Sequence, residues 1–123
     1  MSNSKNFYIN GAWVAPVTAN DFAVINPANE QEVATISLGS QADVDAAVAA
    51  AKAAFETWSM TSKQQRLDLL NKLAEVYASR MDEMAKAIST EMGAPIDMAT
   101  NAQAASGLGN IKGFIRALEG FEF

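Results

Sequence analysis

The residue types that carry most enzyme chemistry are sparse in this chain. Its 123 residues include no cysteine and no histidine. This excludes disulfides and thiolate metal sites, and it removes the commonest metal ligand and general base. Gly107 and Gly109, followed by Lys112 and Gly113, resemble fragments of a phosphate-binding loop. Such a loop must follow a strand and open a helix, whereas these residues fall inside a helical pattern, so we expect close helix packing there.

Two pairs of acidic residues are the remaining candidates for acid–base catalysis. Asp43 and Asp45 lie at the predicted start of one helix, and Asp82 and Glu83 lie at the start of another. Capping and the helix dipole explain carboxylates in these positions. A general acid or base needs burial and a reacting partner within reach, and nothing nearby indicates either. We therefore predict structural roles for both pairs.

Residues 1–39 are predicted to form the β-structure that precedes the helices. Asn10-Gly11 lies between two short apolar runs and is typical of a two-residue hairpin turn, since both residues tolerate positive φ. A further strand over 22–25 ends at Asn26-Pro27, because proline cannot donate to a strand ladder. Residues 32–38 alternate as a strand does and stop at Gly39.

Residues 40–93 are predicted to form three amphipathic helices. Ser40 and Asp43 form a capping box at the start of the first, and Ser62 and Gln65 form another at the start of the second. Gly93 ends the third in the position where helices favour positive φ. The apolar stripe of the first helix comprises Val44, Ala47, Val48, Ala51, Phe55 and Trp58. The five methionines between residues 60 and 98 are predicted to be core filler.

Residues 94–123 are predicted to form a fourth helix and the beginning of a strand. Pro95 suits the first turn of a helix that runs to about Leu118 and has a very small-sided middle. Phe121-Glu122-Phe123 alternates as a strand does. The whole is an α+β segment, either a small domain or a piece whose sheet is completed elsewhere. An unpaired apolar edge favours the second reading.

Composition narrows the class of protein further. A chain of 123 residues with 50% hydrophobic and 19% charged residues is long enough for one domain with a core. A net charge of −5 and scattered basic residues argue against a nucleic-acid partner. There is no membrane-spanning apolar run and no signal-peptide core, so we expect a soluble, cytoplasmic protein.

The order and spacing of several motifs resemble the N-terminal part of the aldehyde dehydrogenase superfamily. The matching residues are Ile25-Asn26-Pro27-Ala28-Asn29-Glu30, Glu32 to Ile36, Ala42 to Val48, Ala51 to Phe55, Trp58, Arg66-Leu67 and Leu69-Leu70. The resemblance covers nearly the whole chain, from the opening hairpin to Gly120-Phe121. It implies that the segment is part of the α/β fold of a full enzyme.

In that family a cysteine thiolate attacks the aldehyde, hydride passes to NAD or NADP, and water releases the acid. The catalytic cysteine, its glutamate base, the oxyanion asparagine and the cofactor-binding units are all absent from this chain. The resemblance therefore implies a segment that is inactive alone and binds no cofactor. Its partner would be the remainder of an enzyme chain that is usually dimeric or tetrameric.

The resemblance also indicates two possible sites. An ungapped comparison from the Glu91-Met92-Gly93-Ala94-Pro95 turn puts Ala102 and Ser106 in the substrate tunnel, where small residues would leave room for a long or bulky aldehyde. Tight backbone packing is the equal alternative. Some family members hold a monovalent cation on backbone carbonyls near this turn and near the equivalents of Val24 and Ile25. The turn is explained as a helix stop and restart, so no metal is predicted.

Two other functions stay open. The chain could be a stand-alone interaction module that docks on a partner subunit through its apolar surface. The parent enzyme could also pass the acyl group to coenzyme A rather than to water.

Overall fold

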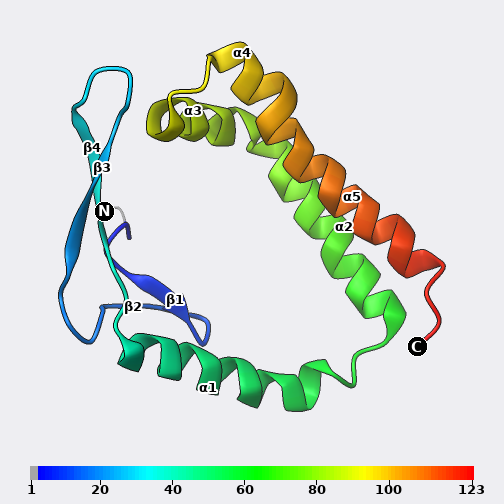
Figure 1. Cartoon of the computed structure of the whole chain (residues 1–123). Coiled ribbons are helices and arrows are strands. Elements are labelled where there is room, and N and C mark those ends of the chain that lie inside the picture. Colours follow the sequence, from blue (N-terminus) through cyan, green and yellow to red (C-terminus); the bar gives the residue numbers. More distant parts are fainter. Residues whose placement is uncertain (1–2) are drawn as a thin grey trace. The chain divides into compact units, whose positions relative to one another are not determined.

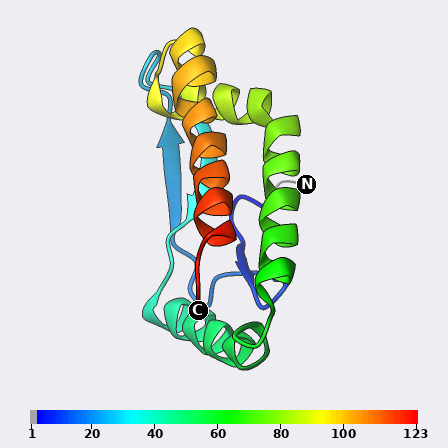
Figure 2. The same ribbon diagram turned by 90° about the vertical axis from the view of Figure 1, so that its right-hand side faces the viewer.

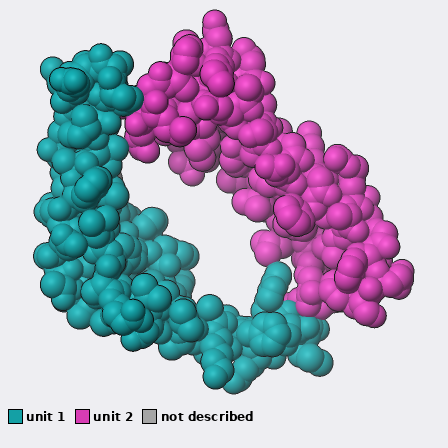
Figure 3. Space-filling view, in the orientation of Figure 1, with its two compact units in different colours: residues 1–60 teal, residues 61–123 magenta. Residues whose placement is uncertain are grey.

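The computed structural model describes residues 3–123. These residues divide into two compact units, one of residues 1–60 and one of residues 61–123 (Figure 3). The sequence predicted a single segment with changes of character after residues 39 and 93. That division stays a prediction. The boundary between the two compact units falls in the loop between the first two long helices, so one helix belongs to the same unit as the β-structure and the others form a unit of their own.

The first unit contains two antiparallel strand pairs and one helix (Figure 1). In the first pair, β1 (Phe7–Ile9) is joined to β2 (Ala12–Val14) by the predicted turn, in which Asn10 and Gly11 have φ values of 52° and 77°. In the second pair, β3 (Asp21–Ile25) lies beside β4 (Glu32–Ser37). The register of this pair shifts between Val24 and Ile25, and helix α1 (Gln41–Trp58) follows.

No apolar side chain is buried among the described residues of this first unit. Its two buried residues, Ser37 and Asp43, are both polar. The predicted apolar stripe of α1 is present, yet Val48 is 60% exposed and Phe55 is 65% exposed. The stripe therefore has the spacing of a buried helix face, but no other described residues of this unit cover it.

The second unit consists of helices. They are α2 (Lys63–Ser79), α3 (Met81–Met92), α4 (Ile96–Met98), a π-helical stretch η1 (Ala99–Ala104) and α5 (Ala105–Glu119). Helix α5 packs along α2, as both ribbon views show (Figures 1 and 2). The capping box of Ser62 and Gln65 and the left-handed Gly93 are confirmed.

The region after Gly93 departs from the prediction in three ways. The expected fourth helix is interrupted by the π-helical stretch η1. Pro95 is the residue that precedes the helix, with a ψ of 137°, rather than its first helical residue. Residues 121–123 do not form a strand, because no described strand lies beside them.

The core of the second unit is built from small side chains. Ala85, Ala99 and Ala104 form a buried cluster against which Ile88 and Ala94 pack. Ala99 and Ala104 are five residues apart and both are 0% exposed. In an ideal α-helix that spacing puts two residues about 140° apart, whereas the i→i+5 bonding of a π-helix brings them to one side. The π-helical stretch is thus what places both alanines in the core.

The methionines do not act as core filler within this chain. Met60, Met84, Met92 and Met98 are between 42% and 84% exposed. Met81 is the half-buried one of the five. That prediction is wrong for the described residues taken alone, because the helix faces that carry the methionines have little packed against them.

Candidate functional site at the π-helical stretch

The two residues predicted to line a substrate tunnel lie on the helix that runs through η1. Ala102 belongs to η1 and Ser106 to the first turn of α5, and both are exposed. The hydroxyl of Ser106 donates a hydrogen bond to the carbonyl of Gln103 at 2.7 Å. This bond ties the hydroxyl to its own helix, so the face presents little side-chain volume and no free donor at Ser106.

A tyrosine from α2 holds the same helix from the other side. The hydroxyl of Tyr77 donates to the carbonyl of Ala104, the last residue of η1, at 2.9 Å. Gly107 lies directly beside this ring. A Cβ atom placed on Gly107 would lie 2.3 Å from the Tyr77 hydroxyl oxygen and 2.7 Å from the carbon that bears it. Only glycine fits this position while Tyr77 keeps its place.

The glycines of α5 are therefore not equivalent. A Cβ atom on Gly109 would meet nothing within 4 Å, and one on Gly113 would approach only the end of the Arg116 side chain, at 3.9 Å. The prediction of close helix packing holds for Gly107 alone.

These residues do not form a dinucleotide site. Gly107 and Gly109 lie in the middle of helix α5, where backbone N–H groups are used within the helix rather than turned towards a phosphate. The donor set of this region therefore does not fit NAD or NADP.

Sequence reasoning did not find the π-helical stretch or the role of Tyr77. Tyr77 is half-buried, and its hydroxyl bond to another helix leaves no trace in periodicity. Four alanines lie between residues 99 and 105, and the sequence does not show which of them are buried. The side-chain oxygen of Gln103, also in η1, is buried without a hydrogen-bond partner among the described residues.

The acidic pair at the start of α1 has the structural role predicted for it. The Asp43 carboxylate accepts hydrogen bonds from the backbone N–H groups of Val17 at 2.9 Å and Ser40 at 2.8 Å. It also accepts one from the Ser40 hydroxyl at 2.6 Å. These donors, the Ser40 hydroxyl first, hold the pKa of Asp43 below its ordinary value. Asp45 accepts from the side chain of Gln41 at 2.8 Å.

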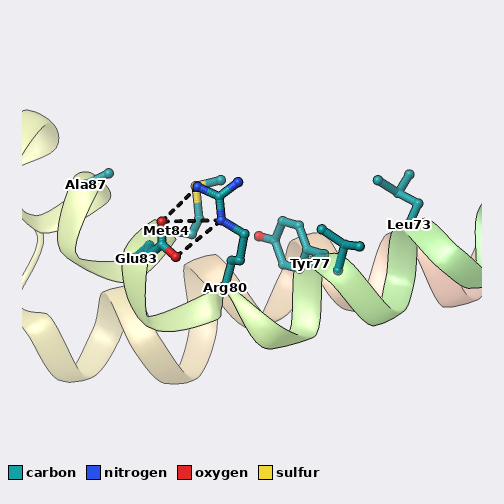
Figure 4. A pocket seen from close by; sticks show the side chains of 7 residues that line it. Leu73, Tyr77, Arg80, Glu83, Met84 and Ala87 are labelled. Atoms are coloured by element: carbon teal, nitrogen blue, oxygen red, sulfur yellow. Dashed lines mark hydrogen bonds and ion pairs between the residues drawn. The ribbon is translucent and has the colours of Figure 1, made fainter. Parts of the chain in front are cut away.

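Glu83, one residue of the acidic pair of α3, borders an open depression of about 360 Å³ (Figure 4). Its lining residues are Leu73, Val76, Tyr77, Arg80, Glu83, Met84 and Ala87. Figure 4 shows Arg80 and Glu83 facing one another, with a shortest contact of 2.8 Å. The hydrogen bond from Arg80 lowers the pKa of Glu83, which keeps this carboxylate ionised and paired. It is not placed as a general acid.

No cation was predicted at the turn where some family members hold one, and that absence stays a prediction. Val24 and Ile25 lie in the first unit, where they flank the register shift of β3, and Glu91 lies in the second unit. Among residues 3–123, no group of three or more acidic side chains is arranged to hold a metal ion. None of the described helices is both long and apolar enough to cross a membrane.

Comparisons with known proteins agree with the helix and strand order. The aldehyde dehydrogenase family matches residues 13–122. Over its full length the chain is 47% identical to a 3-succinoylsemialdehyde-pyridine dehydrogenase from a Pseudomonas species, of which it covers 26%. It is 37% identical to a putative aldehyde dehydrogenase of Staphylococcus saprophyticus, again covering 26% of that protein.

Solved structures give the same result. The whole chain superposes on an aldehyde dehydrogenase from Bartonella henselae with a TM-score of 0.96 and 52% identity, covering 26% of it. It also superposes on a mutant of aldehyde dehydrogenase C from Pseudomonas syringae, in complex with NAD⁺ and octanal, with a TM-score of 0.96 and 41% identity. Here 98% of this chain covers 25% of the other.

The predicted α+β segment is therefore confirmed, and it spans about a quarter of the length of the relatives that it matches. The match lies in the N-terminal part of those relatives, as the sequence motifs indicated. The chain belongs to the aldehyde dehydrogenase family.

Proposed function

We propose that this chain is the non-catalytic N-terminal scaffold of an NAD(P)-dependent aldehyde dehydrogenase. The observation that carries the proposal is the exposed apolar face of α1, which includes Val44, Val48, Phe55 and Trp58 at 45% to 65% exposure. A helix stripe of this kind is ordinarily buried against other parts of a domain. Because the relatives are about four times longer, the rest of such an enzyme is the natural partner of this face.

The parent enzyme would convert an aldehyde, water and NAD(P)⁺ into a carboxylic acid, NAD(P)H and a proton. A nucleophile, a base and a dinucleotide site are needed for this reaction, and residues outside this segment would supply them. We propose that the 123-residue chain alone binds no cofactor and is inactive. The parent would work in the cytoplasm as a dimer or tetramer.

Within the parent, Ala102 and Ser106 would line the substrate entrance. Their exposure on one helix, and the absence of bulk at both positions, support a wide entrance that admits a long or bulky aldehyde. Octanal is present in the complex of the Pseudomonas syringae relative, and an aldehyde of similar length is a suitable first substrate to test.

A chimera tests the proposal. In the Bartonella henselae enzyme, the N-terminal quarter that matches this chain is replaced by residues 1–123. With octanal and NAD⁺ or NADP⁺ we expect reduced cofactor to form, at a rate within about tenfold of the Bartonella parent, since scaffold changes leave the reacting groups in place. The same parent lacking this quarter, and the chain alone, should both be inactive. A folded chimera without activity would contradict the proposal.

The interaction-module alternative makes a different prediction in the same assay. When the chain and the remaining three quarters are expressed as separate polypeptides, a module that folds alone would restore activity on mixing. A scaffold that folds only with its parent would restore activity on co-expression and not on mixing.

A further inference from the structure

The contact between Tyr77 and the π-helical stretch links the scaffold to the substrate entrance. We propose that Tyr77 and Gly107 fix the rotation of the helix face bearing Ala102 and Ser106, and thereby set the length of aldehyde that the parent enzyme accepts. This inference rests on the proposed function. Neither Tyr77 nor Gly107 is proposed to touch substrate, so both are positioning residues.

The π-helical stretch η1 is a conformation that needs support from its neighbours. π-Helical turns are rare, and they accommodate one residue more than the α-helix would hold over the same rise. The buried alanines at both ends of η1 and the hydroxyl of Tyr77 on the carbonyl of Ala104 supply that support. The hydroxyl bond is the one polar contact in this set, and it comes from a different helix.

Loss of this support would change the rotation of the helix on either side of η1. If η1 relaxed to a regular α-helix, its residues would rotate by about 100° relative to α5, the angle of one residue in an α-helix. Ala102 lies within η1 and would turn through part of this angle, whereas Ser106 lies beyond η1 in the first turn of α5. Their relative orientation, and with it the width of the entrance, therefore depends on η1 persisting.

The ring of Tyr77 lies directly beside Gly107. The predicted 2.3 Å approach of a Cβ atom leaves no room for alanine unless the tyrosine ring or the helix moves. Since the ring is anchored by its hydroxyl to Ala104, movement of either one disturbs η1. Tyr77 and Gly107 therefore act as one contact that fixes the position of η1 and α5 relative to α2.

The test uses the active chimera with four forms: unchanged, Tyr77→Phe, Gly107→Ala and Gly109→Ala. Tyr77→Phe removes the hydroxyl and keeps the ring. Gly109→Ala is the matched control, because it adds the same methyl group two residues further along α5 where nothing lies within 4 Å. For each form, kcat and KM are measured with a series of straight-chain aldehydes from acetaldehyde to octanal.

In Tyr77→Phe we expect the KM for octanal to rise about tenfold, the effect of losing one hydrogen bond to the carbonyl of the buried Ala104, with kcat changed by less than about twofold. The KM for acetaldehyde should stay within about twofold, because a short substrate does not span the entrance. Gly107→Ala should raise the ratio of the KM for octanal to the KM for acetaldehyde at least as far as Tyr77→Phe does. Gly109→Ala should leave this ratio unchanged. Equal losses on short and long aldehydes in Tyr77→Phe would show a merely structural role and overturn the proposal.

Hydrogen exchange of the backbone amides of residues 99–109 gives a readout that does not depend on activity. Exchange should quicken in Tyr77→Phe and Gly107→Ala and stay unchanged in Gly109→Ala. Unchanged exchange in Tyr77→Phe would overturn the positioning role. A folded chimera inactive on every aldehyde contradicts the proposed function instead, and the exchange result then decides the role of Tyr77 by itself.

Discussion

The two units of this chain are held together in different ways. All the buried apolar residues of the described chain, Ala85, Ala99, Ala104 and Ile115, belong to the helical unit of residues 61–123. The unit of residues 1–60 has hairpins, a capped helix and a long apolar stripe, but its buried side chains are polar. The described part of the first unit therefore has its helix and strands in place without a hydrophobic core of its own.

The difference in buried apolar residues indicates that the first unit depends more on the rest of the parent enzyme than the second unit does. Hydrogen bonds each contribute about 0.5–1.5 kcal/mol net, whereas burial of one large apolar side chain contributes about 1.5–3 kcal/mol. The second unit can draw on both kinds of interaction, although its core is small. The first unit has the hydrogen bonds that form its strands and its helix. We expect the remaining stability to come from the residues that cover α1 in the parent enzyme.

The largest expected effect separates the two units most clearly. Phe55→Ala should destabilise the chimera by about 3–5 kcal/mol, because the ring would be buried there. In the isolated chain, where Phe55 is 65% exposed, the same change should cost less than about 0.5 kcal/mol. Denaturant unfolding followed by far-UV circular dichroism measures both. Glu56→Ala, on the next residue of α1, is the control and should be nearly neutral in both proteins.

An unchanged melting temperature for Phe55→Ala in the chimera would break the comparison. It would mean that the apolar stripe of α1 faces solvent in the parent as well, and that the first unit is stabilised by its hydrogen bonds alone.

A smaller effect is expected in the core of the second unit. Ala104→Leu should destabilise both the isolated chain and the chimera by about 1–3 kcal/mol, because Ala104 is completely buried against Ala85 and Ala99 and has no room for three more carbons. Ala102→Leu, two residues earlier on the exposed side of η1, should cost less than about 0.5 kcal/mol. Equal costs for the two leucines in an unfolding titration would contradict the assignment of faces.

Sequence reasoning succeeded where the cause of the structure is local. The turn at Asn10-Gly11, the capping box at Ser62 and the left-handed Gly93 each follow from the chemistry of one or two residues, and each is confirmed. The predicted capping interaction of Asp43 is confirmed as well, although the bond from Val17, 26 residues away, was not foreseen.

It failed where the cause is a contact between elements. The π-helical stretch places Ala99 and Ala104 together in one buried cluster with Ala85, and Tyr77 donates to the carbonyl of Ala104. Neither contact follows from the period of the sequence. The prediction that the methionines fill a core failed because a contact is missing. Their helical spacing indicated a buried face, and no part of the described chain covers that face. The tunnel role of Ala102 and Ser106 stays a prediction.

The third prediction concerns the hydrogen bonds that replace a core in the first unit. The pKa of Asp43 is lowered in the folded chain, so its ionised form is favoured by folding. Its contribution to stability is therefore fully present above the ordinary pKa of 3.8 and is lost as the pH falls through the lower, folded-state value. Wild type should be more stable than Asp43→Asn at neutral pH, and the gap should close in acid. Asp45→Asn is the control.

A gap between wild type and Asp43→Asn that stays constant down to about pH 2 would show that the shape of the side chain matters and its charge does not. Unfolding midpoints of the chimera, measured across this pH range, distinguish the two outcomes.

The smallest effect is expected where the second unit uses a charge at a helix end. The ammonium group of Lys63 donates to the carbonyl of Glu119, the last residue of α5, at 3.1 Å and to that of Phe121, just beyond the helix, at 3.4 Å. A cation at a helix C-terminus contributes about 0.3–1 kcal/mol, and salt screens it. Lys63→Gln should therefore lower stability by that amount at low ionic strength and by less in about 1 M salt.

Lys72→Gln, which breaks an exposed pair with Glu75, should change stability by no more than this at any salt concentration. A loss for Lys63→Gln well above 1 kcal/mol would mean that the second unit, like the first, depends on polar contacts more than on its alanine core.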